Sequence, residues 1–172
     1  MNSFDWYSPD EDSYTLVDVL QEENIQNSLV IDLGTSTGFI TNSLDKSNVI
    51  IGSDLNLKAL KKQKEGNLIH MDLLNCIRQD LIDIIIFNPP YVLNSNCSII
   101  GGGVDGCAII NRFIKEIECN IFYLLVIEAN KPKEIIKKIE AKGYTVQIKK
   151  IRKILGETIF ILKGKNKFFL NI

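Results

Sequence analysis

The sequence predicts an α/β protein with a seven-stranded, mostly parallel sheet and helices on both faces. From Leu29 onward, short apolar runs alternate with amphipathic stretches, which is the pattern of β-α-β units. The last two apolar runs are separated only by residues 150–157, too few for a crossover helix. These two strands should therefore form an antiparallel hairpin at the carboxyl end of the chain.

The apolar runs place each strand and the amphipathic stretches place each helix. Strands are expected at residues 29–33, 49–54, 68–71, 82–87, 121–127, 145–149 and 158–162. Helices are expected at residues 12–22, 39–44, 56–64, 106–117 and 132–142. Pro132 suits the first turn of the last helix, and Gly143 suits its end. With 172 residues, the chain is long enough for one domain with a substantial core, so we expect a single domain over residues 1–172.

Composition and charge exclude several classes of protein. Hydrophobic residues make up 45% and charged residues 24%, which argues against a disordered or fibrous chain. A formal net charge of -1 gives no general excess of Lys and Arg, so direct nucleic-acid binding is not expected. Cys76, Cys97, Cys107 and Cys119 form no Cys-x-x-Cys pair, so neither a metal site nor a disulfide framework is expected. No signal peptide or membrane-spanning run is visible, and we expect a cytoplasmic protein.

A tight turn follows the first expected strand. Val30-Ile31-Asp32-Leu33-Gly34 leads into Thr35-Ser36-Thr37-Gly38, where Gly34 and Gly38 allow backbone to approach a ligand closely. The Gly-x-Gly-x-x-Gly pattern of dinucleotide-binding proteins is absent. Glycine-bearing turns of this kind are common in α/β folds, so the turn alone does not establish a cofactor.

Acidic residues at the ends of the first three strands strengthen the case for a cofactor pocket. Asp54 closes the second strand about 20 residues beyond the turn, where a carboxylate can accept both hydroxyls of a ribose. Its alternative role is to cap the helix that begins near Asn56. Asp72 follows the third strand and could accept the exocyclic amine of adenine. The candidate pocket residues in these three turns are Asp32, Gly34, Gly38, Asp54, Leu55, Asp72 and Leu73.

The tetrapeptide Asn88-Pro89-Pro90-Tyr91 follows the apolar run at 82–87, at the carboxyl end of a buried strand. In an open α/β sheet this end faces the ligand crevice. The side-chain oxygen of Asn88 and the carbonyl of Pro89 can accept both hydrogens of a planar NH2 group. Pro90 restricts the backbone before it, and Tyr91 supplies an aromatic wall.

These acceptors suit methyl transfer to an amide or amino nitrogen. An amide nitrogen is a poor nucleophile, and two fixed acceptors orient its lone pair and stabilise the positive charge that develops on it. The alternative interpretation is a rigid turn that simply ends a strand. Alongside the three aspartates, we favour the catalytic interpretation, with Asn88, Pro89, Pro90 and Tyr91 as the catalytic residues.

With these motifs the chain resembles the HemK-type glutamine methyltransferases, most closely the short eukaryotic and archaeal form that modifies class I translation termination factors. Tyr7-Ser8-Pro9-Asp10-Glu11-Asp12-Ser13 looks like the family's leading Tyr-x-Pro-x-Glu-Asp-Thr/Ser segment. Gly102, Gly103, Asp105 and Gly106 look like its Gly-Gly-x-x-Gly element, and Gly156-Glu157-Thr158 like its final hairpin. The resemblance implies a class I (Rossmann-like) fold.

The resemblance also implies S-adenosylmethionine as cofactor and the glutamine of a Gly-Gly-Gln loop as substrate. Residues 1–22 would close the cofactor site, with Tyr7, Pro9, Ser13 and Asn88 among the binding residues. Two positions depart from the family: Ser36 stands where a glycine is usual, and Leu93 stands in a short 92–100 segment where a proline is common. A serine at position 36 is either strained or accompanied by a shifted turn.

A partner subunit is the last expectation. Only residues 1–6 precede the Tyr7 segment, whereas longer bacterial relatives carry a recognition domain there. The resemblance implies a small zinc-binding activator, and the third strand, from Leu68 to Met71, should be a sheet edge open to strand addition. His70 and Met71 would then be interface residues; otherwise His70 is an ordinary polar residue beside the cofactor loop.

Two other functions remain open at this point. An adenine methyltransferase acting on DNA or RNA faces the same hydrogen-bonding problem, although the low net charge argues against it. Ser36 and the expected partner also fit a non-catalytic cofactor-binding subunit.

Overall fold

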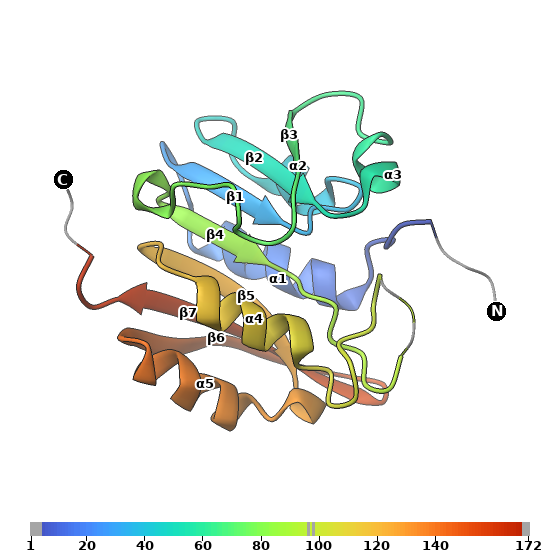
Figure 1. Cartoon of the computed structure of the whole chain (residues 1–172), viewed down its shortest axis with the longest axis vertical. Helices are drawn as coiled ribbons and strands as arrows, with labels where there is room; N and C mark the ends of the chain where they lie inside the picture. Colours follow the sequence, from blue (N-terminus) through green and yellow to red (C-terminus); the bar gives the residue numbers. More distant parts are fainter. Residues whose placement is uncertain (1–4, 96, 98, 170–172) are drawn as a thin grey trace.

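A computed structural model describes residues 5–95, 97 and 99–169 and contains one seven-stranded sheet (Figure 1). The strand order is β3-β2-β1-β4-β5-β7-β6; β7 is antiparallel to both β5 and β6, and the other neighbouring strands are parallel. The strands are β1 (Leu29–Leu33), β2 (Val49–Asp54), β3 (Asn67–His70), β4 (Ile84–Phe87), β5 (Ile121–Ile127), β6 (Tyr144–Ile154) and β7 (Glu157–Asn166). This topology confirms the predicted fold class.

Helices cover both faces of the sheet (Figure 1). They are α1 (Glu11–Glu22), α2 (Phe39–Ser43), α3 (Leu57–Leu60), α4 (Ala108–Glu116) and α5 (Pro132–Ala141), with 3₁₀ turns η1 (Gln79–Leu81) and η2 (Glu128–Asn130). Side chains of α4 and α5 share one apolar cluster with β5, and side chains of α1 and α2 share a second. Strand β5 is buried on both faces, which explains its unbroken apolar run.

Several predicted boundaries were wrong, each for a local physical reason. The hairpin link is only Leu155–Gly156, because β6 and β7 continue well beyond the apolar residues that predicted them. Helix α3 ends early, since Lys62 and Gln63 donate to carbonyls three residues back instead of four. Strand β4 begins at Ile84 because Ile82 ends the turn η1.

Strand β3 is an edge of the sheet, as predicted, but it begins and ends one residue earlier. Met71 therefore lies beyond the strand and is only 6% exposed, packed in the apolar cluster under α4. The expectation that Met71 is an interface residue was wrong. His70 is exposed, and its Nε2 lies 2.9 Å from the carbonyl oxygen of Leu55. Within the described ranges, no helix is long and apolar enough to cross a membrane.

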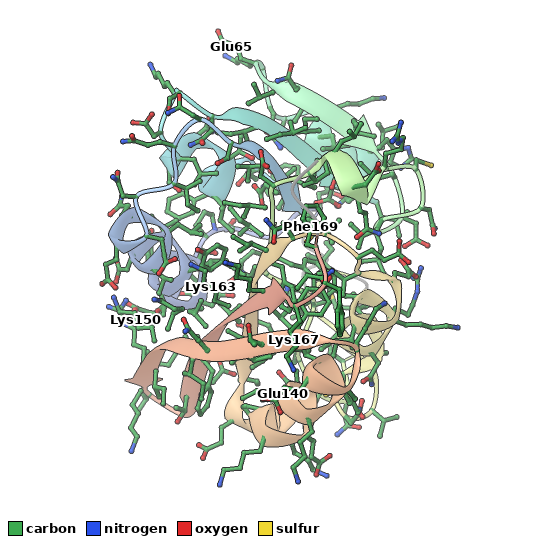
Figure 2. All side chains as sticks on the ribbon, turned by 90° about the vertical axis from the view of Figure 1, so that its left-hand side faces the viewer. Glu65, Glu140, Lys150, Lys163, Lys167 and Phe169 are labelled. Carbon is green, nitrogen blue, oxygen red and sulfur yellow. The ribbon has the colours of Figure 1, made fainter. Side chains whose placement is uncertain are left out.

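Glu23, at the carboxyl end of α1, ties this helix to the sheet. Its carboxylate accepts a hydrogen bond from the Tyr123 hydroxyl at 2.6 Å and pairs with Lys149 at 2.6 Å and with Lys163. Figure 2 shows Lys163 beside α1. Burial raises the pKa of Glu23, but the hydrogen bonds from Lys149, Lys163 and Tyr123 outweigh it and lower the pKa from 4.5 to about 2.

Replacing Glu23 by glutamine should lower the free energy of unfolding by about 2 kcal/mol at pH 7. Because the folded-state pKa is depressed, this contribution is complete above 4.5 and is lost as the pH falls towards 2. Urea unfolding at pH 7 and pH 3 should show the gap between wild type and Glu23→Gln shrinking by about half. The exposed Glu134→Gln variant is the control, and a gap independent of pH would contradict the assignment.

Candidate active site

The tetrapeptide Asn88–Tyr91 lies where the sequence placed it, directly after β4 at the carboxyl end of the parallel strands. Phe87 is paired with Leu33 of β1 and Leu124 of β5, so the tetrapeptide leaves the middle of the sheet. A Cβ on Gly34 would lie 3.5 Å from the Phe87 ring and 3.9 Å from the Asn88 carbonyl oxygen. The turn after β1 and the tetrapeptide are therefore neighbours at the carboxyl ends of the strands.

Asp12, near the start of α1, joins the amino-terminal segment to the tetrapeptide. It is 3% exposed, and its Oδ2 accepts hydrogen bonds from Asn88 Nδ2 at 3.0 Å and from the Tyr91 hydroxyl at 2.9 Å. Its Oδ1 accepts from the Tyr7 hydroxyl at 2.6 Å and from the Ser13 amide and hydroxyl at 2.5 and 3.2 Å. A buried carboxylate near a helix amino terminus is further stabilised by the helix dipole.

The Asp12 carboxylate fixes which atom of the Asn88 amide is available. A carboxylate accepts and does not donate, so the NH2 group of Asn88 must face Asp12 and Oδ1 must point away. Asn88 Oδ1 is buried and has no hydrogen-bond partner within the described part of the chain. A buried acceptor left in this state is unfavourable unless a ligand donates to it.

The two tyrosines of this cluster keep their protons. Burial, followed by the Asp12 charge and weaker effects of Glu157 and Tyr7, raises the pKa of Tyr91 well above its ordinary value. Burial and the hydrogen bond to Asp12 raise the pKa of Tyr7 in the same way. Both phenols therefore act as hydrogen-bond donors to Asp12, not as bases.

Asp32 is fully buried on β1, below the glycine-bearing turn. Its Oδ2 accepts from the Thr41 amide at 3.1 Å and the Thr41 hydroxyl at 2.7 Å, while Oδ1 has no partner within the described residues. Burial raises the pKa of Asp32 to about 6, although hydrogen bonds from Thr41 and Thr35 oppose this. Oδ1 is thus a buried acceptor that lacks a donor among the described residues.

Gly34 and Gly38 both have positive φ angles, 70° and 82°, as a close-approach turn requires. Asp54, at the end of β2, faces the same turn. Its Oδ2 accepts from the Ser36 amide at 2.8 Å and its Oδ1 from the Asn56 amide at 2.7 Å. Asn56, and not Asp54, caps α3, so the capping role considered for Asp54 was wrong.

The remaining candidates lie beyond β3 and in the amino-terminal segment. The Met71 amide donates to the Asp54 carbonyl, which brings Asp72 next to the end of β2. Arg112 of α4 holds Asp72 through two hydrogen bonds of 3.2 and 3.0 Å. Leu73 is buried, Leu55 is 65% exposed and Pro9 is half-buried. Among the described residues, no group of three or more His, Cys, Asp or Glu side chains could hold a metal ion.

Ser36 adopts a left-handed conformation with φ 48°, which is unfavourable for a residue with a side chain. Its hydroxyl donates to the Tyr7 carbonyl at 2.9 Å, a contact that glycine cannot make. Its own carbonyl accepts from Gln63 Nε2 at 2.9 Å. The serine thus carries backbone strain but fastens the amino-terminal segment to the pocket.

We expect Ser36→Ala to destabilise the protein more than Ser36→Gly, by about 1 kcal/mol. Alanine loses the hydrogen bond to Tyr7 and keeps the positive-φ strain, whereas glycine loses the bond but relieves the strain. Urea unfolding of the three proteins gives the order. If Ser36→Gly were the least stable, strain at this position would be negligible.

Sequence reasoning missed Asp12, Thr41 and Arg112 as parts of this site. In the sequence, Asp12 stands out only as one residue of the Tyr7–Ser13 motif, and its partner Asn88 lies 76 positions away. No local pattern reveals such a contact, since helix α1 and the tetrapeptide meet only in the tertiary structure.

Comparison with known proteins agrees with this geometry. The family described as "Methyltransferase small domain" matches residues 1–101, more than half of the chain. The chain belongs to the methyltransferase small domain family. A chain of the E. cuniculi Mtq2-Trm112 complex, responsible for methylation of the eRF1 translation termination factor, is 49% identical, with a TM-score of 0.93. The match covers 95% of this methyltransferase and 100% of that chain.

Two further relatives of this methyltransferase fall in the same group. The eRF1 methyltransferase catalytic subunit mtq2 of Schizosaccharomyces pombe is 26% identical over 92% of this chain and 88% of that protein. Methyltransferase HEMK2 of Homo sapiens is 25% identical over 92% of this chain and 89% of that protein. The predicted relationship to the HemK-type methyltransferases is confirmed.

Proposed function

We propose that this protein transfers a methyl group from S-adenosylmethionine to the side-chain amide of the glutamine in the Gly-Gly-Gln loop of a class I release factor. The observation that carries the proposal is Asn88 Oδ1, a buried acceptor that has no partner among the described residues and that Asp12 holds in one orientation. The names of the E. cuniculi and S. pombe relatives, which refer to eRF1, support the choice of substrate.

The chemistry of the residues around the turn after β1 suits S-adenosylmethionine. Asp32 Oδ1 is a buried acceptor below the turn with no partner among the described residues, and Gly34 and Gly38 leave the two ends of that turn without side chains. Asp54 would accept the ribose hydroxyls and Asp72 the adenine amine, with Leu55 and Leu73 beside them. Tyr7, Pro9 and Ser13 would close over the methionine part, so that residues 1–22 complete a single domain spanning 1–172. When bound, the cofactor supplies a methyl group on a sulfonium.

The chain's own residues prepare the substrate nitrogen. Asn88 Oδ1 and the Pro89 carbonyl accept its two hydrogens, which orients the nitrogen lone pair towards the methyl donor. The same two dipoles stabilise positive charge as it develops on nitrogen. The Tyr91 ring packs against the planar amide of the substrate, while the Tyr91 hydroxyl donates to Asp12. Once methylated, the nitrogen carries a positive charge and would lose one proton to solvent, so no tyrosine needs to act as a base.

The decisive experiment is radiolabelled methyl transfer to purified release factor, with and without glutamine in its Gly-Gly-Gln loop, in the presence of the activator subunit. Label that depends on the glutamine supports the proposal. Labelling of DNA or RNA in a parallel reaction would favour the adenine methyltransferase instead. Binding of the cofactor without transfer to either substrate would indicate a non-catalytic subunit.

The partner would be a small zinc-binding activator that adds a strand to β3, and the complex would work in the cytoplasm, where release factors act. The described edge of β3 carries exposed apolar side chains, with Ile69 at 38%, and Leu55 and Leu57 of the preceding loop and helix at 65% and 44%. Exposed apolar residues beside an open edge are suited to strand addition.

Ile69→Asp should weaken binding of the activator by about tenfold or more, because a charge would be desolvated at the contact. Ile151→Asp is the matched control, since Ile151 is 54% exposed on β6 at the other edge of the sheet. Calorimetric titration of each variant with the activator measures the effect. Equal binding by both variants would exclude β3 as the docking edge.

A further inference from the structure

The tetrapeptide has a second fixed point besides Asp12. Asn130 lies in the turn η2, between β5 and α5, and is 2% exposed. Its Nδ2 donates to the Tyr91 carbonyl at 3.1 Å and to the Gly106 carbonyl at 3.3 Å. Its Oδ1 accepts from the Ile127 amide at 3.0 Å, at the end of β5. One buried side chain thus connects three separate backbone segments.

The Tyr91 carbonyl depends on this contact. Within the described residues, no backbone N–H outside the regular elements donates to it. The next residue already belongs to the loop that follows, since the Val92 amide donates to Ile100 and its carbonyl accepts from Gly102. The contact between Asn130 and the Tyr91 carbonyl therefore holds the backbone at the end of the tetrapeptide, just before the loop begins.

Gly106 explains why the three segments meet so closely. It has a φ of 69°, and a Cβ there would collide with the Tyr91 carbonyl and lie 2.5 Å from Asn130 Nδ2. Asparagine has the two donors and one acceptor that the Tyr91, Gly106 and Ile127 groups require. Aspartate has the same shape but would place a carboxylate oxygen against two carbonyls.

We infer that Asn130 is a positioning residue for methyl transfer, acting through Tyr91, an inference that rests on the proposed function. Asp12 holds the hydroxyl of Tyr91 and Asn130 holds its carbonyl, so the residue is fixed at both ends. Asn88 and Pro89 lie between this point and the end of β4, and their acceptor oxygens take their positions from both. A displacement of about 1 Å at such a site is enough to slow a reaction about 100-fold.

The test compares Asn130→Asp with wild type and with Asn111→Asp, a control on α4 whose side chain accepts a hydrogen bond from Lys138. In the complex with the activator, Asn130→Asp should lower kcat by about 10- to 100-fold, while KM for S-adenosylmethionine changes by less than about twofold. Hydrogen exchange should increase in the peptide spanning residues 88–95 and remain unchanged in β1 and β5. Asn111→Asp should behave as wild type in all three measurements.

The inference is overturned if Asn130→Asp keeps wild-type kcat and wild-type exchange at 88–95. It is also overturned if exchange rises equally throughout the sheet, because the role would then be general stability. Should Asn130→Asp not fold, Asn130→Ser, which retains one smaller donor, replaces it with the same expected pattern. If wild type transfers no methyl to release factor, the proposed function fails, whereas the exchange comparison still decides whether Asn130 positions the tetrapeptide.

Discussion

Asn88→Ala is expected to reduce kcat for methyl transfer by about 100- to 1000-fold, with the affinity for S-adenosylmethionine changed by less than about twofold. The substrate amide would lose the acceptor that orients its lone pair and stabilises the charge developing on nitrogen. That acceptor is most needed in the transition state, so kcat should fall far more than binding. Single-turnover transfer with radiolabelled cofactor measures the rate, and calorimetry measures the affinity.

Two variants sharpen this test. Asn111→Ala removes an asparagine of α4 outside the pocket and should retain wild-type turnover. Asn88→Asp keeps an acceptor of the same shape but places a second carboxylate against Asp12, so it should also be impaired. Unchanged turnover in Asn88→Ala would refute the role assigned to this side chain, even if the release factor proved to be the substrate.

The central strands and the position of the tetrapeptide could be predicted because they depend on local pattern. Strands β1, β2 and β5 were predicted to the residue, since each is an apolar run that ends at a glycine, an aspartate or a polar turn. The place of Asn88 follows directly from the end of β4. Parallel strands in an α/β sheet bring their carboxyl ends together, which is why Asp32 and Asp54 also came to one region.

The contacts that orient these groups could not be predicted, because they depend on tertiary structure. Asp12 meets Asn88 across 76 positions, and Asn130 meets Tyr91 across 39. The burial of Met71 was missed for the same reason: it depends on the chain beyond β3 passing under α4, which is a tertiary contact. The hairpin was predicted too short because β6 alternates charged and apolar residues, which conceals its continuation to Ile154.

Asp12→Asn is expected to reduce kcat by about 100-fold and to leave KM for S-adenosylmethionine within about threefold of wild type. Asp12 Oδ2 now accepts from both Asn88 and Tyr91, and an asparagine has only one oxygen for the donors that surround it. If the NH2 group of the new asparagine faces Asn88, the Asn88 amide must flip so that its oxygen accepts from that group. Asn88 Oδ1 then no longer faces the substrate. Asp18→Asn is the control, an aspartate of the same helix that is paired at the surface with Lys150 and Arg152.

A double-mutant cycle decides whether Asp12 acts through Asn88. If its main role is to orient the Asn88 amide, adding Asp12→Asn to Asn88→Ala should slow the reaction no further than Asn88→Ala alone, because there is no amide left to orient. If the two effects multiply, Asp12 contributes independently, and the most direct route is its hydrogen bond to Tyr91. In that case Tyr91→Phe, which removes only the hydroxyl, should reproduce the remaining loss. If Asp12 only orients the Asn88 amide, the double variant is as slow as Asn88→Ala. If Asp12 supports the site in other ways, the double variant is slower, so the measured rates separate the two roles.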